Sequence, residues 1–323
     1  KFLHRFVGAA GKSSAPQRVV VNRSHGDSIL ETLGTCCFAK LPFSMNEVSP
    51  AFTQRDVQRV RDHDLQRTTD ALAVEEPLEI RVVSTHMKPV SVSVTMRTPG
   101  HDDELALGFL WSEGVIANFD QIESVRAVGP PQGESRAQNI VQVNLKNAVD
   151  FARLNRNFYT TSSCGVCGKA SLNAVAQLLE TIEYSQDDAK VSAATIHALP
   201  QTLRASQNAF EQTGGLHAAA LFDASGNLIA AREDVGRHNA LDKLLGSQLL
   251  QNDLPLHDKI VLVSGRASFE LVQKTLMAGA PIIAAVGAPS SLAVDLAKRF
   301  GLTLLGFVRD GRFNIYSGFE RII

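Results

Sequence analysis

Hydrophobic and polar positions follow two different rhythms along the C-terminal half of the chain. Short apolar runs, of which 260–263 is one, stand between segments whose apolar residues recur every three or four positions. Such runs are typical of strands buried on both faces, and such segments are typical of amphipathic helices. The rhythm predicts strands at 216–222, 228–233, 259–265, 281–287, 302–308 and 312–318, and helices at 237–250, 267–279 and 290–301. Strands that alternate with helices indicate an α/β domain with a mostly parallel sheet covered by helices.

The segment before this domain is richer in strands. Alternation of apolar and polar residues predicts strands at 78–83, 92–97, 122–128 and 139–145. The first two are expected to form an antiparallel pair. Residues 102–114 begin with acids and end at Gly114, which predicts a short helix.

The middle of the chain is expected to hold a loop and two helices. The loop spans 160–168, and a helix is predicted from about 169 to 183. A second helix fits 195–211 and ends in Gly214-Gly215, where glycine permits the positive φ that terminates helices.

The first residues show no periodicity. Residues 1–44 carry glycine, serine and scattered charges, and the polar stretch that starts at Met45 is interpreted as a solvated leader. We therefore divide the chain into a poorly ordered leader at 1–74, with a native start at Met45, a β-rich part at 75–158 and an α/β domain at 159–323. A shortened chain that starts at Met45 is expected to fold as well as the full chain, because a segment that buries little apolar surface adds little stability.

Composition narrows the class of protein. Of the 323 residues 44% are hydrophobic and 20% charged, and the formal net charge is −1. A core of ordinary size is therefore possible, and bulk binding to nucleic acid is not expected. No apolar run approaches the roughly 20 residues that cross a bilayer, and the basic start is too broken for a secretory signal.

The four cysteines stand in two pairs. Cys36 and Cys37 are adjacent in the leader and are interpreted as incidental. Cys164 and Cys167 form a C-x-x-C, which in a reducing cytosol is redox-active, metal-binding or sulfur-handling.

Three functional interpretations of the C-x-x-C compete with that of two small buried cysteines. A working thiolate needs a lowered pKa, and this motif precedes a predicted helix start and Lys169, which both favour an anion. Those features suit a persulfide carrier. A zinc site needs four ligands, and only the remote His217 and His238 are candidates to complete it. A thioredoxin motif would follow a strand in a small βαβ unit, which this motif does not. The polar, glycine-rich surroundings favour function over burial.

Three loops, at 264–268, 287–291 and 307–312, leave the carboxyl ends of predicted strands. Ligands bind beyond such ends in open α/β sheets. Helix starts and arginines in such loops suit phosphate. Each loop alone is also explained by ordinary turn and cap chemistry, since serine caps helices and Asp-Gly makes turns. The candidate ligand-binding residues are Ser264, Gly265, Arg266, Ser290, Phe307, Val308, Arg309, Asp310, Gly311 and Arg312.

A fourth polar element connects a strand to a helix at 233–243. Arg237 and His238 stand there beside Gly236, and such dense polarity at a strand-to-helix turn suggests a ligand site. A capped helix start with a histidine bonded to backbone explains it equally well.

These motifs together resemble the FdhD family of formate dehydrogenase accessory proteins. The likeness runs from about Glu75 to the C-terminus. The matching segments are 75–82, 97–116, 162–171, 214–222, 233–246, 263–279 and 287–317.

The resemblance implies a cytoplasmic, homodimeric sulfurtransferase with a cytidine-deaminase-like three-layer α/β core and a smaller β-rich N-terminal part. Such a protein takes sulfur from a cysteine desulfurase as a persulfide and passes it to the bis-(molybdopterin guanine dinucleotide) molybdenum cofactor needed by formate dehydrogenase. By position Cys164 resembles the persulfide cysteine, Cys167 its partner, and 307–312 the nucleotide-cofactor segment. No nucleic acid, membrane or resident metal is expected.

Two other functions remain open. The protein could bind the cofactor as a chaperone without carrying sulfur. A zinc deaminase would need H-x-E and P-C-x-x-C, but His217 is followed by three alanines and the C-x-x-C lacks a preceding proline.

Overall fold

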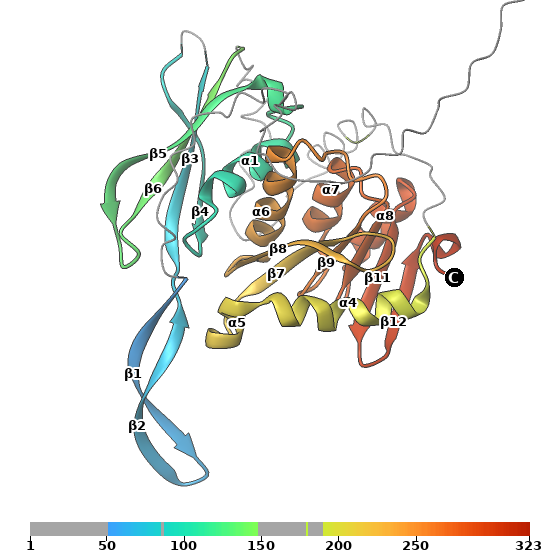
Figure 1. Cartoon of the computed structure of the whole chain (residues 1–323), viewed down its shortest axis with the longest axis horizontal. Coiled ribbons are helices and arrows are strands. Elements are labelled where there is room, and N and C mark those ends of the chain that lie inside the picture. The colour runs from blue at the N-terminus through green and yellow to red at the C-terminus, as the bar shows by residue number, and fades with distance from the viewer. Residues whose placement is uncertain (1–50, 85–86, 148–178, 180–189) are drawn as a thin grey trace, which may run out of the picture. The chain divides into compact units, whose positions relative to one another are not determined.

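The computed structural model describes residues 51–84, 87–147, 179 and 190–323. A six-stranded sheet organises the C-terminal part (Figure 1). Its strands, in the order β12-β11-β10-β9-β7-β8, are β7 (His217–Phe222), β8 (Leu228–Asp234), β9 (Ile260–Val263), β10 (Ile282–Ala285), β11 (Thr303–Arg309) and β12 (Arg312–Ser317).

The sheet is mixed, which corrects the expectation of a mostly parallel one. Strands β9, β10 and β11 run parallel, but β12 pairs antiparallel with β11, and β7 pairs antiparallel with both β8 and β9. The reason is local, because short turns join β7 to β8 and β11 to β12, and such turns can only connect antiparallel neighbours.

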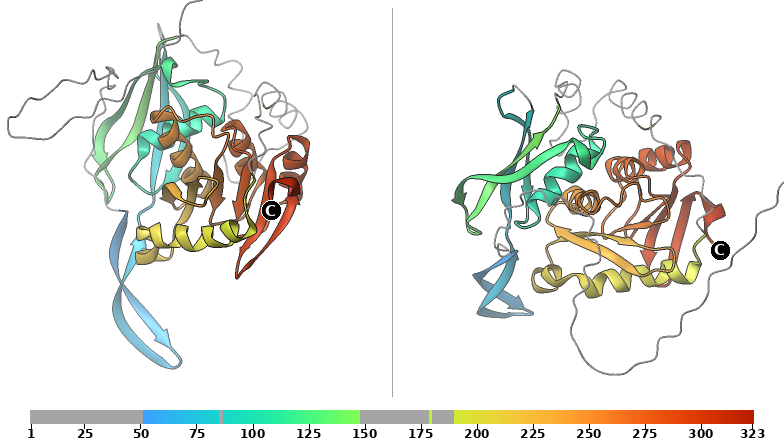
Figure 2. Two further views of the ribbon diagram at one scale, coloured as in Figure 1. Left: turned by 45° about the vertical axis from the view of Figure 1, so that its right-hand side comes forward. Right: turned by 45° about the horizontal axis from the view of Figure 1, so that its top comes forward.

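Helices cover both faces of this sheet, as the predicted three-layer core requires. On one face lie α6 (Arg237–Leu250), α7 (Phe269–Met277) and α8 (Ser291–Arg299), whose apolar residues share a core with Val261, Val263 and Ile283. On the other face α4 (Ala193–Ser206) packs against a second set of strand residues. Figures 1 and 2 show α4 on the opposite side of the sheet from α6, α7 and α8.

The helix expected at 195–211 is two helices. After α4 the chain breaks at Gln207 and resumes as α5 (Asn208–Thr213). The Glu233 carboxylate accepts hydrogen bonds from the backbone N–H groups of Ala209 and Phe210, at 3.1 and 2.8 Å. A carboxylate from β8 thus satisfies the start of a new helix, and this tertiary contact has no local sequence signal.

The N-terminal part contains a four-stranded sheet in the order β4-β3-β6-β5. The strands are β3 (Glu76–Ser84), β4 (Val90–Arg97), β5 (Ile122–Gln132) and β6 (Ala137–Leu145), and α1 (Asp102–Ser112) contributes to the same core. The antiparallel pair β3–β4 and the short helix confirm the predictions made for this segment. Single-turn 3₁₀ helices occupy Phe119–Gln121 and Phe319–Arg321.

The stretch expected as a solvated leader forms a hairpin where the structure describes it. Strand β1 (Phe52–Arg61) pairs with β2 (Asp64–Ala73) over its whole length, drawn in blue in Figure 2. The expectation of a leader up to residue 74 is therefore wrong for 52–73. Polar side chains on both faces hide the strand period, since the usual signal is one buried face.

Helix α1 packs directly on α6. A Cβ atom added to Gly108 of α1 would lie 1.8 Å from the Asp242 carbonyl oxygen, and one added to Gly246 of α6 would lie 1.9 Å from that of Glu104. Only glycine permits such close backbone approach at both positions. This contact joins the helix of the N-terminal part to a helix that covers one face of the six-stranded sheet. In the described part of the chain no helix is long and apolar enough to cross a membrane.

Candidate ligand-binding site

The three loops predicted to form a ligand site meet at one edge of the six-stranded sheet. Gly287 donates its backbone N–H to the Gly265 carbonyl at 2.9 Å, and Phe307 donates to the Gly287 carbonyl at 3.0 Å. Ala267 and Pro289 form a further bridge. A Cβ on Gly287 would lie 3.0 Å from the carbonyl oxygen of Gly265 and 3.0 Å from the backbone nitrogen of Arg266. Glycine at position 287 therefore lets the two loops contact each other.

The end of β11 and the turn that follows it have an unusual backbone conformation. Phe307 has φ of 56°, and Asp310 and Gly311 have φ of 55° and 70°. Positive φ is uncommon for a bulky side chain such as phenylalanine, and residues of that kind cluster at ligand sites. Arg309 and Arg312 flank the turn with exposed side chains, and Arg309 Nε lies 3.8 Å from Asp310 Oδ2.

The fourth predicted element lies at the same edge. Strand β7 is antiparallel to β9, so its first residue, His217, lies beside the loop that follows β9. A Cβ on Gly265 would stand 3.3 Å from His217 Nδ1 and 3.8 Å from Arg237 Cδ. His217 and Arg237 therefore both flank the backbone of Gly265, and α6 starts beside them.

These side chains make the edge electropositive. Burial lowers the pKa of His217, and the charges of Arg237 and His238 lower it further. A neutral imidazole therefore faces two cationic or potentially cationic neighbours. The Arg237 Nε atom is buried and has no hydrogen-bond partner among the described residues. Buried guanidinium nitrogens normally have partners, so this one has a donor to offer a ligand.

His238 is held from the β9–α7 loop. Its Nε2 atom lies 2.7 Å from Glu270 Oε2 and 3.2 Å from Ser268 Oγ. Glu270 belongs to the first turn of α7 and Ser268 precedes that helix. The imidazole is thus fixed from a second element as well as from its own helix.

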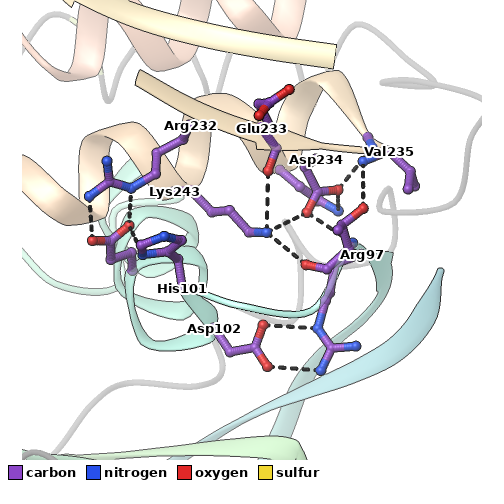
Figure 3. Close-up of polar contacts among 12 residues, drawn as sticks. Arg97, His101, Asp102, Arg232, Glu233, Asp234, Val235 and Lys243 are labelled. Carbon is purple, nitrogen blue, oxygen red and sulfur yellow. Dashed lines mark hydrogen bonds and ion pairs between the residues drawn. The ribbon is translucent and has the colours of Figure 1, made fainter. Parts of the chain in front are cut away.

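A buried ion pair anchors the start of α6 from behind (Figure 3). Lys243 Nζ lies 2.7 Å from Asp234 Oδ2 and donates to the Thr98 carbonyl at 2.8 Å. Asp234 also accepts from the backbone N–H groups of Thr98 and Gly236, at 3.1 and 2.9 Å. Both oxygens of this carboxylate are used, which fixes the turn that presents Arg237 and His238.

Two arginines extend these polar contacts into the N-terminal part (Figure 3). The contacts of Lys243, Asp234, Arg97 and Arg232 are together called the joint. Arg97 makes two parallel hydrogen bonds to Asp102, at 2.9 and 2.8 Å, and a third to Asn139. Arg232 of β8 makes two to Glu104 of α1, at 2.5 and 2.6 Å. Bidentate pairs of this kind fix orientation as well as contact, so β8 and α1 are held in register.

A second buried charge lies on α7. Lys274 Nζ lies 2.8 Å from Asp242 Oδ1 and 2.7 Å from Ser112 Oγ. Burial would lower the pKa of Lys274, but the carboxylates of Asp242 and Glu113 outweigh it and raise that pKa. The lysine is therefore charged, and it links α7 with α6 and α1.

Three of the predicted ligand residues are already engaged in the fold. Ser264 Oγ accepts from the Ala218 N–H at 2.8 Å, and Ser290 Oγ caps α8 by accepting from the Ala293 N–H at 3.2 Å. The Val308 side chain is fully buried in the core, so only its backbone can face a ligand. A ligand contact by these residues stays a prediction, as it does for Arg266, which is exposed.

Cys164 and Cys167 lie outside the described residues. Their roles rest on the sequence alone. Within the described ranges no group of three or more histidine, cysteine, aspartate or glutamate side chains is arranged to hold a metal ion.

The sequence does not reveal several residues of this edge. The pattern offers His217 only as a remote zinc ligand and Ser268 only as an ordinary helix cap, and nothing local distinguishes Glu270. Two lysines give a sequence signal for the buried ion pairs. Lys243 and Lys274 lie inside helices of a buried layer, where a charged residue requires a partner.

The chain is similar to one protein family over most of its length. The model of the FdhD/NarQ family matches residues 73–323. A sulfur carrier protein FdhD of Mycolicibacterium paratuberculosis is 52% identical over 256 residues, covering 78% of this chain and 92% of that protein. A sulfur carrier protein FdhD of Streptomyces coelicolor is 50% identical over 272 residues, covering 83% and 95%.

A crystal structure is also similar over most of the chain. It is of a Desulfotalea psychrophila protein classed as a formate dehydrogenase accessory protein. The TM-score is 0.66 at 27% identity, with 85% of this chain and 100% of that chain covered.

Proposed function

Because the chain belongs to the FdhD/NarQ family, we propose that it is a sulfurtransferase that carries sulfur as a persulfide on its C-x-x-C motif. It accepts the sulfur from a cysteine desulfurase and delivers it to the molybdenum of a bis-(molybdopterin guanine dinucleotide) cofactor, its substrate, for use by formate dehydrogenase. The relatives that match over most of their length are named sulfur carriers, which supports the first half of this proposal.

The observation that carries the second half is the edge where the three loops meet. Gly265, Gly287 and Phe307 form one row of backbone hydrogen bonds there. The start of α6 and the free donor of Arg237 lie beside this row. Backbone N–H groups at helix starts together with arginine suit the phosphates of a nucleotide cofactor.

Arginines beyond the row extend the proposed contact. Arg309 and Arg312 flank the turn at Asp310-Gly311 and are exposed. Two forked guanidinium groups beside a second phosphate would fix the orientation of a long ligand. The backbone of Phe307 has a positive φ, and its ring is proposed to contact the base of the nucleotide.

The loading step needs no oxidant. The terminal sulfur of the donor persulfide forms a bond to Cys164 Sγ, and the bond from that sulfur to the donor cysteine breaks. The donor cysteine leaves as a thiolate and takes up the proton lost by Cys164. Cys167 is proposed to assist or resolve, since a second thiol two residues away can attack a disulfide or persulfide sulfur.

Other features complete the proposal. The sheet order β8-β7-β9-β10-β11, with β7 antiparallel and the last three parallel, supports a cytidine-deaminase-like core. A cytoplasmic homodimer is proposed from the family resemblance.

Replacement of Cys164 by alanine tests the carrier role. In a strain that lacks its own copy of this protein, Cys164→Ala should fail to restore formate dehydrogenase activity, and Cys167→Ala should reduce it less. Cys36→Ala is the matched control and should behave as the native protein. Full activity with Cys164→Ala would remove that residue from the mechanism.

Calorimetry with guanosine diphosphate tests the ligand site. Arg312→Ala should weaken binding by about 1.5–3 kcal/mol, the contribution of one charge-assisted phosphate contact. Arg299→Ala, on α8, is the control and should bind as the native protein does. If the native protein does not bind at low salt, the nucleotide site is misplaced.

A cofactor chaperone that carries no sulfur is the second candidate. The same edge would serve it, and sulfur labelling distinguishes the two. A zinc deaminase is disfavoured because His217 leads no H-x-E motif and the C-x-x-C lacks a preceding proline.

A further inference from the structure

Ser268, which precedes α7, and Glu270, in the first turn of α7, both contact one nitrogen of His238. Glu270 Oε2 lies 2.7 Å from Nε2, and Ser268 Oγ lies 3.2 Å from the same atom. The imidazole is partly exposed, with 31% of the side chain accessible, so this hold leaves one side of the ring open.

The hydroxyl of Ser268 is diverted from its ordinary task. Ser268 stands at the N-cap of α7 with extended backbone angles, yet its side chain makes no cap hydrogen bond. Ser290 occupies the same position before α8 and does cap that helix. Serine is among the preferred N-cap residues, so α7 forgoes an available cap while its serine contacts His238.

The partner chemistry decides which nitrogen faces outward. An ionised carboxylate can only accept, so the proton of the neutral imidazole sits on Nε2 and points to Glu270. Nδ1 then carries the lone pair and is the nitrogen left for a ligand. Protonation of Nδ1 would turn it into a donor while the hold on Nε2 stays unchanged.

Several positive charges lie near His238. The ring sits in the first turn of α6, where the helix dipole is positive, beside Arg237 and His217. Asp234 and Asp242 are already paired with lysines. Among the described residues, Glu270 is the carboxylate in contact with the ring.

Glu270 is suited to offset that charge. Its hydrogen bond from His238 lowers the pKa of the carboxyl, and the positive charges of Lys274 and Arg237 add to this against an opposing effect of burial. The carboxylate therefore stays ionised near neutral pH.

We propose that Glu270, helped by Ser268, is a positioning residue that directs Nδ1 of His238 to an anionic phosphate group, so that the phosphate binds together with a proton on His238. This inference rests on the proposed function, because it takes the ligand to be a phosphorylated cofactor at this edge. It adds to the proposed site one positioning residue, Glu270, and one proton taken up when the ligand binds.

Titration calorimetry with guanosine diphosphate in two buffers of different ionisation enthalpy measures the proton. At about pH 7.5 the native protein should take up a substantial fraction of one proton on binding. Glu270→Gln keeps the acceptor oxygen but loses the charge. It should take up almost none and bind roughly five- to tenfold more weakly.

Glu113→Gln is the matched control. Glu113 lies 3.7 Å from Lys274, and no contact between it and His238 is present in the described structure. It should retain the proton uptake. Melting temperatures of both variants show whether either loses the fold.

Nitrogen NMR of the ligand-free protein provides a second arm that does not depend on binding. The native protein should show His238 with hydrogen on Nε2, and Glu270→Leu should lose this preference, whereas Glu270→Gln should keep it. Proton uptake unchanged in Glu270→Gln, or a native protein that binds without uptake, overturns the inference.

Failure of the proposed function gives a different signature. A native protein that shows no binding heat at all refutes the nucleotide site and the phosphate role of His238 together. In that case a fixed Nε2–H tautomer that Glu270→Leu abolishes still upholds the positioning by Glu270, and a mixture of tautomers in the native protein refutes it.

Discussion

Arg97 and Arg237 show how differently this protein uses two arginines. Arg97 is fully buried, and its guanidinium group bonds to Asp102, Asn139 and the Glu76 carbonyl. Arg237, at the loop edge, has a buried Nε atom without a partner among the described residues. The fold therefore satisfies one guanidinium group, while the other has a donor without a partner among the described residues.

The same contrast holds for the regions around them. In the joint between α1, β8 and α6, buried charges meet partners that satisfy them on several sides. At the loop edge, the Arg237 Nε atom is buried without a partner among the described residues. The joint is therefore expected to govern stability and the edge to govern binding, because a satisfied polar network stabilises while an unsatisfied donor is useful only to a ligand.

Lys243→Met tests the joint with the largest expected effect. Asp234 would keep its charge without a cation in a site where it is 0% exposed. Removing one partner of a buried pair costs about 3–5 kcal/mol, so denaturant unfolding should shift by that amount or the protein should fail to fold. Lys259→Met, next to the exposed Asp258, should change stability by less than about 0.5 kcal/mol. Equal effects of the two substitutions would show that the joint is no more than a surface pair.

Glu104→Gln tests the pH dependence of the joint. Burial opposes ionisation of Glu104, but hydrogen bonds from Arg232 and His101 outweigh it and lower the pKa of the carboxyl. A lowered carboxyl pKa contributes stability above the ordinary value of 4.5, and this contribution is lost as the pH falls through the folded value. The variant should be less stable by about 1.5–3 kcal/mol near neutral pH.

The difference between Glu104→Gln and the native protein should shrink as the pH falls below 4.5. Denaturant melts at several pH values measure it. A difference that stays constant with pH would mean that the carboxylate charge adds nothing to the joint.

Gly246→Ala tests the close contact of α1 and α6. The new methyl group would stand 1.9 Å from the Glu104 carbonyl oxygen, so the helices must separate. Overpacking of this kind costs about 1–3 kcal/mol in thermal or denaturant melts. Gly215→Ala is the control, since the nearest atom to its Cβ would be the Ala73 Cβ at 3.8 Å. A neutral Gly246→Ala would show that the helices move apart freely.

The two serines at N-cap positions, Ser268 and Ser290, should give the smallest change in stability when replaced. Ser290→Ala removes a working cap and should destabilise by about 1 kcal/mol. Ser268→Ala removes no cap and should destabilise by roughly a few tenths of a kcal/mol. Thermal melts of the two variants compare them. If Ser268→Ala is the more destabilising, its hydroxyl serves the fold rather than His238.

Local signals account for what the sequence predicts well. Helix α6 is predicted at 237–250, its observed bounds, because its polar start follows a strand and Gly236 marks the boundary. The meeting of the loops follows from the parallel strands β9, β10 and β11, whose carboxyl ends lie at the same edge of the sheet.

Contacts distant in sequence account for what it does not predict. The break at Gln207 depends on Glu233 of β8, and the hold on His238 depends on Glu270 of the following helix. The β1–β2 hairpin escapes prediction because its side chains are mostly exposed on both faces, so no buried period marks it. Periodicity reports burial, and these features depend on pairing instead.

Sulfur travels on Cys164 in the proposed mechanism, and mass spectrometry of peptides tests this most directly. The protein is first incubated with a cysteine desulfurase and cysteine. The peptide that holds Cys164 should gain the mass of one sulfur atom and lose it on reduction, and the peptide that holds Cys36 and Cys37 should not change. An unmodified Cys164 peptide, or sulfur found on the Cys36–Cys37 peptide alone, would contradict the mechanism.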